Sequence, residues 1–208
     1  MPTVGFFSDP ACSRHDMGAE HPECPARLDA IQDQLLSSGM EFVLRFFDAP
    51  QATREQIERV HTPEYVASIF DRAPSEGIEV LDEDTRMNPH TLAAALHAAG
   101  SGIDAVDRVI AGEINSAFCA VRPPGHHAER DKAMGFCIFN NIALAAAHAR
   151  EQHGLERVAI LDFDVHHGNG TEDFTAGREG YLFCSSFQSP YYPFTGTGEL
   201  ADNIVNSP

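Results

Sequence analysis

The stretch Val158–Thr171, VAILDFDVHHGNGT, changes within one residue from an apolar run to a cluster of carboxylate and imidazole groups. A short apolar run bounded by polar residues predicts a strand covered on both faces in a parallel sheet, here over residues 158–161. If the strand continues, Asp162, Asp164 and His166 share one face, because side chains alternate along a strand. Gathered there, these groups would lose hydration and repel one another. A bound cation is the simplest explanation.

The rest of the chain alternates predicted strands with predicted helices. The pattern predicts a single α/β domain over residues 1–208, a parallel sheet with helices on both faces. Open sheets of this kind bind ligands at the carboxyl ends of their strands, which favours a site over the alternative, a hydrogen-bonded polar loop. The predicted strands lie at 3–7, 42–47, 78–81, 116–121, 158–161, 181–186 and 204–205, and the predicted helices follow Pro25, Thr53, Thr62, Asn88 and Asn140.

Composition limits the partners and the compartment. The chain has 31 acidic and 14 basic residues and a formal net charge of -17, which disfavours direct nucleic-acid binding and favours a cationic substrate. Its five cysteines include no CxxC pair, so neither a disulfide framework nor a thiolate zinc site is predicted, and a reducing cytoplasm fits best. The sequence shows no export signal and no apolar run long enough for a membrane helix.

A tandem pair of histidines, His126 and His127, follows two prolines after the predicted strand at 116–121. Two adjacent imidazoles beside a metal-like cluster suggest a general base and a general acid in different environments. A carboxylate such as Asp162 would hold one imidazole charged, whereas the amide of Asn169 would favour the neutral form of the other. The alternative is that both histidines are exposed on a surface turn.

Asp164 and His166 are plausible ligands for a zinc-like cation. Catalytic zinc commonly has three protein ligands and a water, polarises a carbonyl and acidifies that water, which is the chemistry of amide or ester hydrolysis. Only two ligands are evident, since no second acidic cluster between Gly170 and Pro208 obviously provides a third.

Four segments together resemble the motifs of the zinc-dependent histone deacetylases, in that family's order and spacing across nearly the whole chain. Agreement of four ordered motifs is far more specific than any single one. The resemblance is nearest to the bacterial deacetylase-like and class II branch, and it implies the three-layer α/β fold of the arginase and deacetylase group. The segments are HPECPAR (21–27), RPPGHHA (122–128), GFCIFNN (135–141) and DFDVHHGNGT (162–171).

The resemblance implies roles for individual residues. Asp164 and His166 would bind zinc, and His126 and His127 would form the catalytic pair. Asp162 would orient His126. Asn169 would face His127, where class I members carry an aspartate. Gly135 and Phe136 would line the substrate tunnel, with Tyr192 on its opposite wall, and Arg27 would lie at the inner end of the pocket. A structural potassium ion would use oxygens of Asp162, Asp164, His166, Ser185 and Ser186.

The sequence departs from the family pattern near its end. The family's third zinc ligand, an aspartate, and its catalytic tyrosine both lie beyond the point where these 208 residues stop. We therefore expect a truncated domain lacking its last strands, with weak zinc affinity and little turnover. We also expect an uncovered sheet edge that favours self-association. After the strand that carries Ser185 and Ser186, Phe187 stands where the family usually has histidine.

The sequence thus predicts a metal-dependent deacetylase, an amidohydrolase that removes acetyl from acetyl-lysine or an acetylated polyamine. The alternative is a non-catalytic, truncated protein of this fold that binds a cation or a partner. A third hypothesis, a binuclear manganese ureohydrolase, is disfavoured, because Gly168 occupies the place of an aspartate which that site needs.

Overall fold

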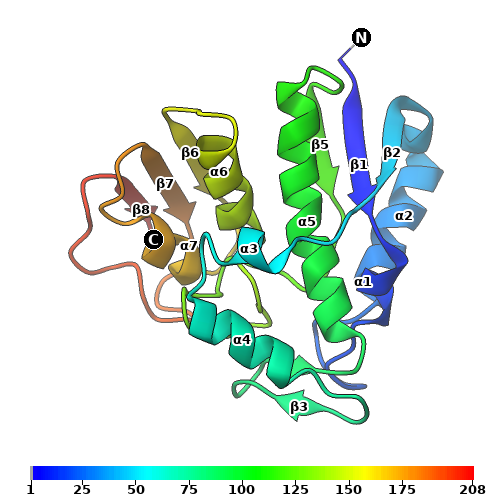
Figure 1. The fold of residues 1–208 in the computed structure, drawn as a ribbon, viewed down its shortest axis with the longest axis horizontal. Helices are drawn as coiled ribbons and strands as arrows, with labels where there is room; N and C mark the ends of the chain where they lie inside the picture. The colour runs from blue at the N-terminus through cyan, green and yellow to red at the C-terminus, as the bar shows by residue number, and fades with distance from the viewer. Residues whose placement is uncertain (1) are drawn as a thin grey trace.

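The structure is a computed structural model that describes residues 2–208. Figure 1 shows strands and helices alternating along the chain. In order, the elements are β1 (Val4–Ser8), α1 (Pro10–Arg14), α2 (Ala26–Ser38), the 3₁₀ helix η1 (Met40–Val43), β2 (Leu44–Asp48), α3 (Arg54–Ile57), α4 (Pro63–Asp71), β3 (Glu79–Val80), β4 (Arg86–Met87), α5 (Thr91–Ile110), β5 (Ser116–Cys119), α6 (Asn141–Glu151), β6 (Val158–Asp162), α7 (Asn169–Thr175), β7 (Tyr181–Ser186) and β8 (Ile204–Ser207).

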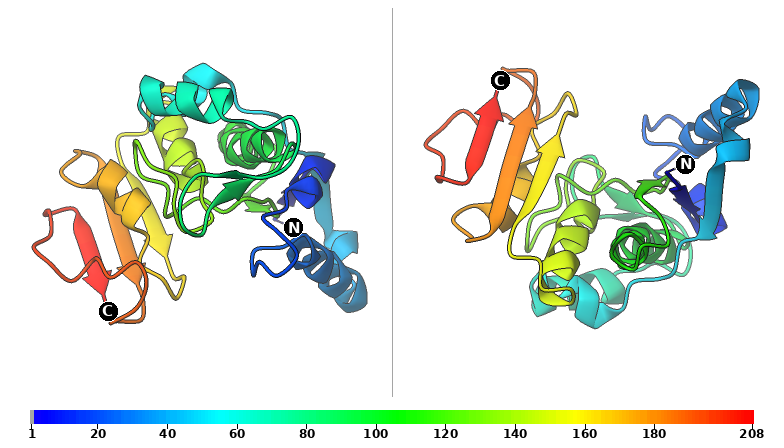
Figure 2. Two further views of the ribbon diagram at one scale, coloured as in Figure 1. Left: turned by 90° about the horizontal axis from the view of Figure 1, so that it is seen from below. Right: turned by 90° about the horizontal axis from the view of Figure 1, so that it is seen from above.

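The strands of the α/β core are parallel but form two separate sheets. One sheet has the order β2-β1-β5 and the other β6-β7-β8, while β3 and β4 form a small antiparallel pair. The prediction of a parallel sheet is therefore confirmed. The strands before the two polar loops, which the alternation of strands and helices predicts to be neighbours or near-neighbours, are β5 and β6, and they lie in separate sheets. Figure 2 shows β6, β7 and β8 standing apart from β1 and β2.

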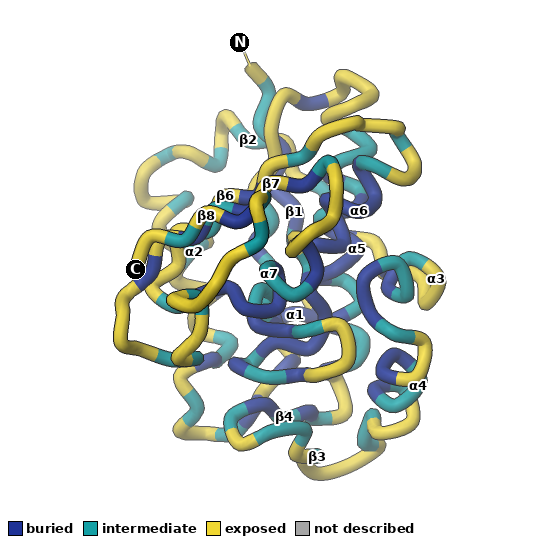
Figure 3. The backbone as a smooth tube through the Cα atoms, turned by 90° about the vertical axis from the view of Figure 1, so that its left-hand side faces the viewer, coloured by how far each residue is buried: buried dark blue, intermediate teal, exposed yellow. Residues whose placement is uncertain are grey.

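Helices cover both faces of the first sheet. Phe6 packs with Leu28 of α2 on one side, and Phe7 packs with Ala105 of α5 on the other. The largest core lies where α5 meets α6 and where α6 and α7 cover one face of β6 and β7. Figure 3 shows this buried region in dark blue.

The second sheet is covered on one face only. Ile160 of β6 is buried against α6, whereas Leu161 is 70% exposed and Leu182 of β7 is 41% exposed. The prediction that residues 158–161 form a strand covered on both faces is thus wrong for one face. The sequence correctly indicates that this strand is apolar. It cannot indicate that one face of the strand is left uncovered by the described residues.

Local capping signals explain where several helices begin. Thr53 and Gln56 form the predicted capping box of α3, and the side chain of Asn140 accepts a hydrogen bond from Ala143 N–H at the start of α6. The long helix α5 begins later than predicted. Asn88 lies outside it and accepts from His90 N–H, while His90 occupies the N-cap position.

Three further differences concern the chain near short elements. The stretch predicted as a strand from residue 42 begins as η1, and α1 and α7 were not predicted. The strand β6 ends at Asp162, so residues 163–166 do not continue its alternation of faces. Phe163 is accordingly 90% exposed instead of packed opposite the polar cluster.

Two compositional expectations can be compared with the structure. All five cysteines are free. Among residues 2–208, no helix combines the length and apolar character that crossing a membrane requires.

Candidate active site

The loop after β5 carries His126 and His127 and is held by backbone hydrogen bonds from α7. The carbonyl of His126 accepts from Gly170 N–H at 3.0 Å and from Thr171 N–H at 3.1 Å. The side chain of Asn140 donates to the carbonyl of Ala128 at 3.2 Å. The loop after β5 and the loop after β6 are therefore folded against each other, as their position at the carboxyl ends of parallel strands predicts.

Asp162, the last residue of β6, contacts the first histidine of the pair. Its Oδ2 lies 2.8 Å from Nδ1 of His126. A carboxylate accepts hydrogen bonds, so Nδ1 of His126 carries the proton of this bond and the ring orientation is fixed. Gly168 is required beside this pair, because a Cβ there would clash with the carboxylate of Asp162. The structure thus brings Asp162 and His126 together as expected.

His127 is buried and bonded to Asn169. Its Nδ1 lies 2.8 Å from Oδ1 of Asn169, whose amide nitrogen donates to Glu129 at 2.7 Å. The amide oxygen accepts, so Nδ1 of His127 is protonated and Nε2 keeps its lone pair. Burial, reinforced by the neighbouring His126, lowers the pKa of His127 to about 3. His127 is therefore neutral, but burial is the cause. The Asn169 hydrogen bond acts in the opposite direction, contrary to the expectation from sequence.

Asp164 and His166 lie on the more open side of the site. Oδ1 of Asp164 is 3.0 Å from Nδ1 of His166, and the His166 ring is 5.8 Å from the His127 ring, centroid to centroid. Burial raises the pKa of Asp164, but hydrogen bonds from His166 and the nearby His126 outweigh burial and leave that pKa below its usual value. A carboxylate and an imidazole nitrogen this close are a donor set that suits a zinc-like cation.

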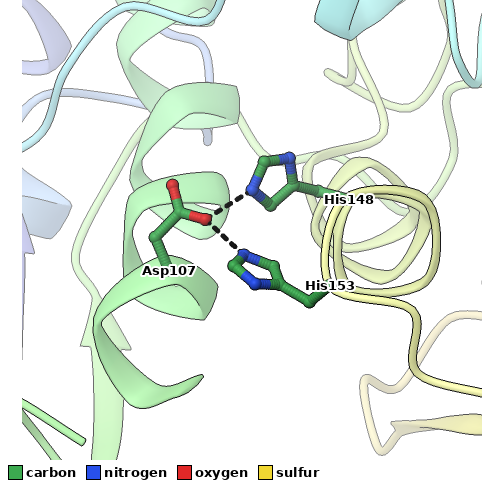
Figure 4. A group of neighbouring side chains, drawn as sticks. All are labelled: Asp107, His148 and His153. Atoms are coloured by element: carbon green, nitrogen blue, oxygen red, sulfur yellow. Dashed lines mark hydrogen bonds and ion pairs between the residues drawn. The ribbon is translucent and has the colours of Figure 1, made fainter. Parts of the chain in front are cut away.

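Among the residues that the structure describes, no third ligand accompanies this pair. Within residues 2–208, the group of histidine and carboxylate side chains close enough to share one ion is a different one, formed by Asp107, His148 and His153. It links the end of α5 to the end of α6 (Figure 4). Because those helix ends precede β5 and β6, the group lies at the amino ends of the strands, opposite the candidate site.

The Asp107 group is already satisfied by hydrogen bonds. Nε2 of His148 and Nε2 of His153 each lie 2.6 Å from the same oxygen of Asp107. Nη1 of Arg59 lies 2.9 Å from Nδ1 of His148. A guanidinium only donates, so Nδ1 of His148 accepts and Nε2 carries the proton. A metal on Nε2 would turn an N–H of His148 toward Arg59, whereas metal-bound histidines normally donate that N–H to an acceptor. We interpret the group as a clamp between the two helices.

One structural observation supports the predicted potassium site, the position of Ser185 beside Asp162. Asp162 and Ser185 are direct partners in the register of β6 and β7. The hydroxyl of Ser185 is buried and has no hydrogen-bond partner. A buried hydroxyl without a hydrogen-bond partner is costly unless a water molecule or an ion satisfies it. Oxygen atoms at this position suit a hard cation.

The predicted tunnel residues gather around His127. Gly135 and Phe136 both have positive φ, 56° and 69°. A Cβ on Gly135 would clash with the imidazole of His127, so glycine is required there. The ring of Tyr192 lies edge-on to His127, 5.1 Å between centroids, and the ring of Tyr191 stacks on His166 at 5.1 Å. Tyr192 and Gly135 thus both lie against the ring of His127, and their placement on opposite walls of a tunnel stays a prediction.

Comparison with known proteins decides the family. Residues 21–207 match the family described as the histone deacetylase domain. The chain belongs to the histone deacetylase family. It is 38% identical over 205 residues to a histone deacetylase-like amidohydrolase of Pseudomonas aeruginosa, covering 98% of this chain and 52% of that protein. It is 40% identical over 175 residues to the human polyamine deacetylase HDAC10, covering 80% of this chain and 26% of that protein.

The fold comparison agrees with the sequence comparison. The crystal structure of the HDA15 HD domain superposes with a TM-score of 0.92 at 32% identity, covering 99% of this chain and 62% of that one. The deacetylase-type three-layer fold predicted from the sequence is confirmed. The chain spans about half the length of the Pseudomonas relative and about a quarter of the human one.

Sequence reasoning missed two residues of this deacetylase-family chain that hold Gly135 and Phe136, the predicted tunnel residues, in place. Oδ1 of Asp84 accepts from Gly135 N–H at 3.0 Å, and Oγ1 of the fully buried Thr85 accepts from Phe136 N–H at 2.9 Å. These bonds hold the left-handed pair in place. The signal was the polar stretch 82–89, to which the sequence alone assigned no purpose. His21 completes this wall, with its ring 4.7 Å from that of Phe136.

Arg27, which the resemblance predicts at the inner end of the pocket, is not enclosed in the structure. The side chain of Arg27 is 58% exposed, and its Nη1 is 4.0 Å from Glu23. The buried arginine is Arg122, which binds both oxygens of Glu23 at 2.5 and 2.6 Å and donates to two backbone carbonyls. Arg122 and His15 keep the pKa of Glu23 below its usual value despite burial. The deacetylase RPPGHH motif thus begins with an anchor at Arg122.

Proposed function

We propose that this chain carries the acid-base half, and two metal ligands, of a deacetylase that hydrolyses the acetyl amide of acetyl-lysine or an acetylated polyamine. The observation that carries the proposal is that His127 is neutral and keeps a lone pair on Nε2. The centroid of its ring lies 5.8 Å from that of His166. The names of the Pseudomonas and human relatives support the reaction class. The net charge of -17 favours a cationic amine substrate.

The proposal assigns the protons to named atoms. Nε2 of His127 accepts a proton from the attacking water, because Nδ1 already donates to Asn169. His126, oriented by Asp162, is the second member of the pair and donates a proton to the departing amine, so that the proton taken up by His127 balances the one that His126 gives. Gly135, Phe136 and Tyr192 would enclose the acylated side chain, and Arg27 stays a prediction for the inner end of the pocket.

Asp164 and His166 would hold the zinc ion, which when bound polarises the amide carbonyl and acidifies a water. Their oxygen and nitrogen donors fit such an ion. A structural potassium ion would lie between Asp162 and Ser185, with backbone oxygens of Asp164, His166 and Ser186 as further ligands. The buried, unpartnered hydroxyl of Ser185 supports this second ion.

We also propose that residues 1–208 alone bind zinc weakly and turn over slowly. The supporting observation is that no third carboxylate or imidazole joins Asp164 and His166 within the described chain. The second candidate function, a non-catalytic protein of this fold that binds a cation or a partner, draws on the same observation. Turnover distinguishes the two.

Zinc titration combined with assays on an acetyl-lysine peptide and an acetylated diamine tests these proposals. We expect slow, zinc-dependent release of acetate, which His127→Ala abolishes and which the exposed-site control His90→Ala preserves. Asp164→Asn should weaken zinc binding, whereas Asp107→Asn should not. Activity that survives His127→Ala would reject the mechanism. A folded wild type without turnover at saturating zinc would favour the non-catalytic function.

A further inference from the structure

The two adjacent histidines His166 and His167 have side chains in different surroundings. The side chain of His166 is 32% exposed, and its ring lies 5.8 Å from that of His127, between centroids. The side chain of His167 is only 1% exposed. The proposed chemistry uses His166 as a metal ligand and leaves His167 without a role. A buried polar side chain beside a proposed ligand therefore needs its own explanation.

His167 makes a hydrogen bond at each ring nitrogen. Its Nδ1 lies 2.9 Å from the hydroxyl oxygen of Thr195, and its Nε2 lies 2.9 Å from Oε2 of Glu172 in α7. An ionised carboxylate only accepts, so Nε2 carries the proton, and Nδ1 of the neutral ring accepts from the Thr195 hydroxyl. His167 therefore ties α7 to the loop between β7 and β8, residues 187–203.

The backbone of this loop lies directly against the ring of His167. A Cβ on Gly196 would lie 2.8 Å from two carbon atoms of the ring, so a side chain there would clash. The carbonyl of Gly196 accepts from the amide of Asn206 in β8 at 3.0 Å. The ring of Phe187, the residue that departs from the family pattern, lies 4.7 Å from that of His167, between centroids, and backs the same contact. We call His167, with Thr195 and Gly196 held against it, the latch.

The loop held by the latch carries aromatic residues of the candidate site. The ring of Tyr191 stacks on that of His166 at 5.1 Å. The ring of Tyr192 lies edge-on to that of His127, also at 5.1 Å. Phe194 N–H donates to the carbonyl of Tyr191 at 2.7 Å, which closes these residues into a turn next to the latch. A displacement of the latch would therefore move both tyrosine rings.

We propose that His167 is a positioning residue, which through Thr195 and Gly196 sets the place of Tyr191 and Tyr192 against the metal ligand and the base. The side chain of Tyr191 belongs to a residue that is 45% exposed, so its own burial holds it weakly. Resting on the proposed function, the proposal has a kinetic consequence. If these rings enclose the acylated side chain, a loosened latch weakens substrate binding more than it slows the chemical step.

The substitution Thr195→Val tests the latch without changing a buried residue, because Thr195 is exposed and only its hydroxyl is lost. Thr197→Val is the matched control, since Thr197 is also exposed and takes no part in the latch. NMR reports the contact between the rings of Tyr191 and His166, and hydrogen exchange reports the amide of Phe194. We expect Thr195→Val to weaken the ring contact and to speed that exchange about tenfold, and Thr197→Val to match the wild type.

A second pair of variants separates positioning from general stability. His167→Gln removes the ring that bonds both Glu172 and Thr195. His148→Gln is its control, because His148 is also buried but bonds Asp107 between α5 and α6. Both variants should lower the urea midpoint, whereas only His167→Gln should weaken the contacts of the tyrosine rings.

Kinetics with the acetyl-lysine peptide complete the test. We expect Thr195→Val to raise KM about fivefold and to change kcat by less than about twofold. Three outcomes overturn the proposal: equal ring contacts and exchange in Thr195→Val and Thr197→Val, equal loosening by His148→Gln and His167→Gln, or a fall in kcat with KM unchanged. The deacetylase proposal fails separately. A wild type without turnover would reject the activity, while the expected NMR and exchange changes in Thr195→Val would still uphold the latch.

Discussion

The loop of His126 and His127 is held by contacts from several distant segments, whereas the segment of Asp164 and His166 is held mainly by one. Asp162, α7 and Asn140 all bind the first loop. The second depends on its own local hydrogen bonds and on the loop after β7, through Gln188 N–H to the carbonyl of Val165 and the ring of Tyr191. The acid-base half of the site is thus preorganised by the described residues, and the metal-binding half has an open side.

The anchor of the well-held loop should give the largest effect. Arg122→Ala leaves the buried Glu23 carboxylate without its bidentate partner, which we expect to destabilise the fold by about 3 to 5 kcal/mol. Arg130→Ala is the matched control, because it breaks an ion pair with Asp173 whose arginine is half exposed, and it should cost about 0 to 1 kcal/mol. Urea unfolding measures both. Equal losses would show that the loop is not anchored at Arg122.

The second largest loss of stability should come from crowding the ring of His127. Gly135→Ala must place a Cβ against the imidazole in a left-handed conformation, and we expect a loss of about 2 to 4 kcal/mol. Gly39→Ala also requires positive φ, but its Cβ meets open space, so about 1 kcal/mol should be lost. The difference between the two variants, again from urea unfolding, isolates the contact with His127. No difference would contradict the preorganised wall.

Acid should weaken the packing behind the well-held loop. His61 accepts from Asn140 N–H and donates to the carbonyl of Glu129, and burial lowers its pKa to about 4. The unfolded chain binds the proton more tightly, so the stability that His61 confers is present above its unfolded pKa and is lost as pH falls toward the folded value. Between about pH 7 and pH 5.5 we expect a loss of about 1 kcal/mol.

The control for this pH dependence is the variant His61→Gln, which cannot titrate. Its unfolding free energy should be lower than that of the wild type near neutral pH, but it should fall less steeply as the solution is acidified. If the wild type and the variant show the same slope over this range, the buried His61 is not a source of acid sensitivity.

The open segment should tolerate substitution. Phe163→Ser removes a ring that is 90% exposed, and we expect a change in unfolding free energy within about 0.5 kcal/mol. A loss comparable to that of Gly135→Ala would mean that Phe163 is covered in solution, which would erase the contrast between the two halves of the site.

Sequence patterns predicted the parts of this fold that depend on local chemistry. The capping box at Thr53, the helix ending at Gly39 and the strand Tyr181–Ser186 follow from residue type and spacing, and the structure confirms all three. The meeting of His126 with Asp162 followed from the alternation of strands and helices, which placed both loops at the carboxyl ends of parallel strands, although β5 and β6 lie in separate sheets. The deacetylase family itself followed from four ordered motifs.

The rest could not be predicted because it depends on partners distant in sequence. The sequence pattern around an apolar residue such as Leu161 is the same whether its face of the strand is covered or exposed. The bends after Asp162 end the strand in spite of a favourable apolar alternation. Asp84 and Thr85 support Gly135 and Phe136 from 51 residues away, and the polar stretch 82–89 around them does not indicate which residues they contact.

The hydrogen bonds from Gly170 and Thr171 to the carbonyl of His126 bear on the order of folding. The first amides of a helix normally lack partners within it, and here a separate loop accepts two of them. Hence these two amides of the first turn of α7 have their protein partner only when the histidine loop has docked. The amides of Gly170 and Thr171 should therefore exchange with solvent only when both loops open together, as one cooperative unit.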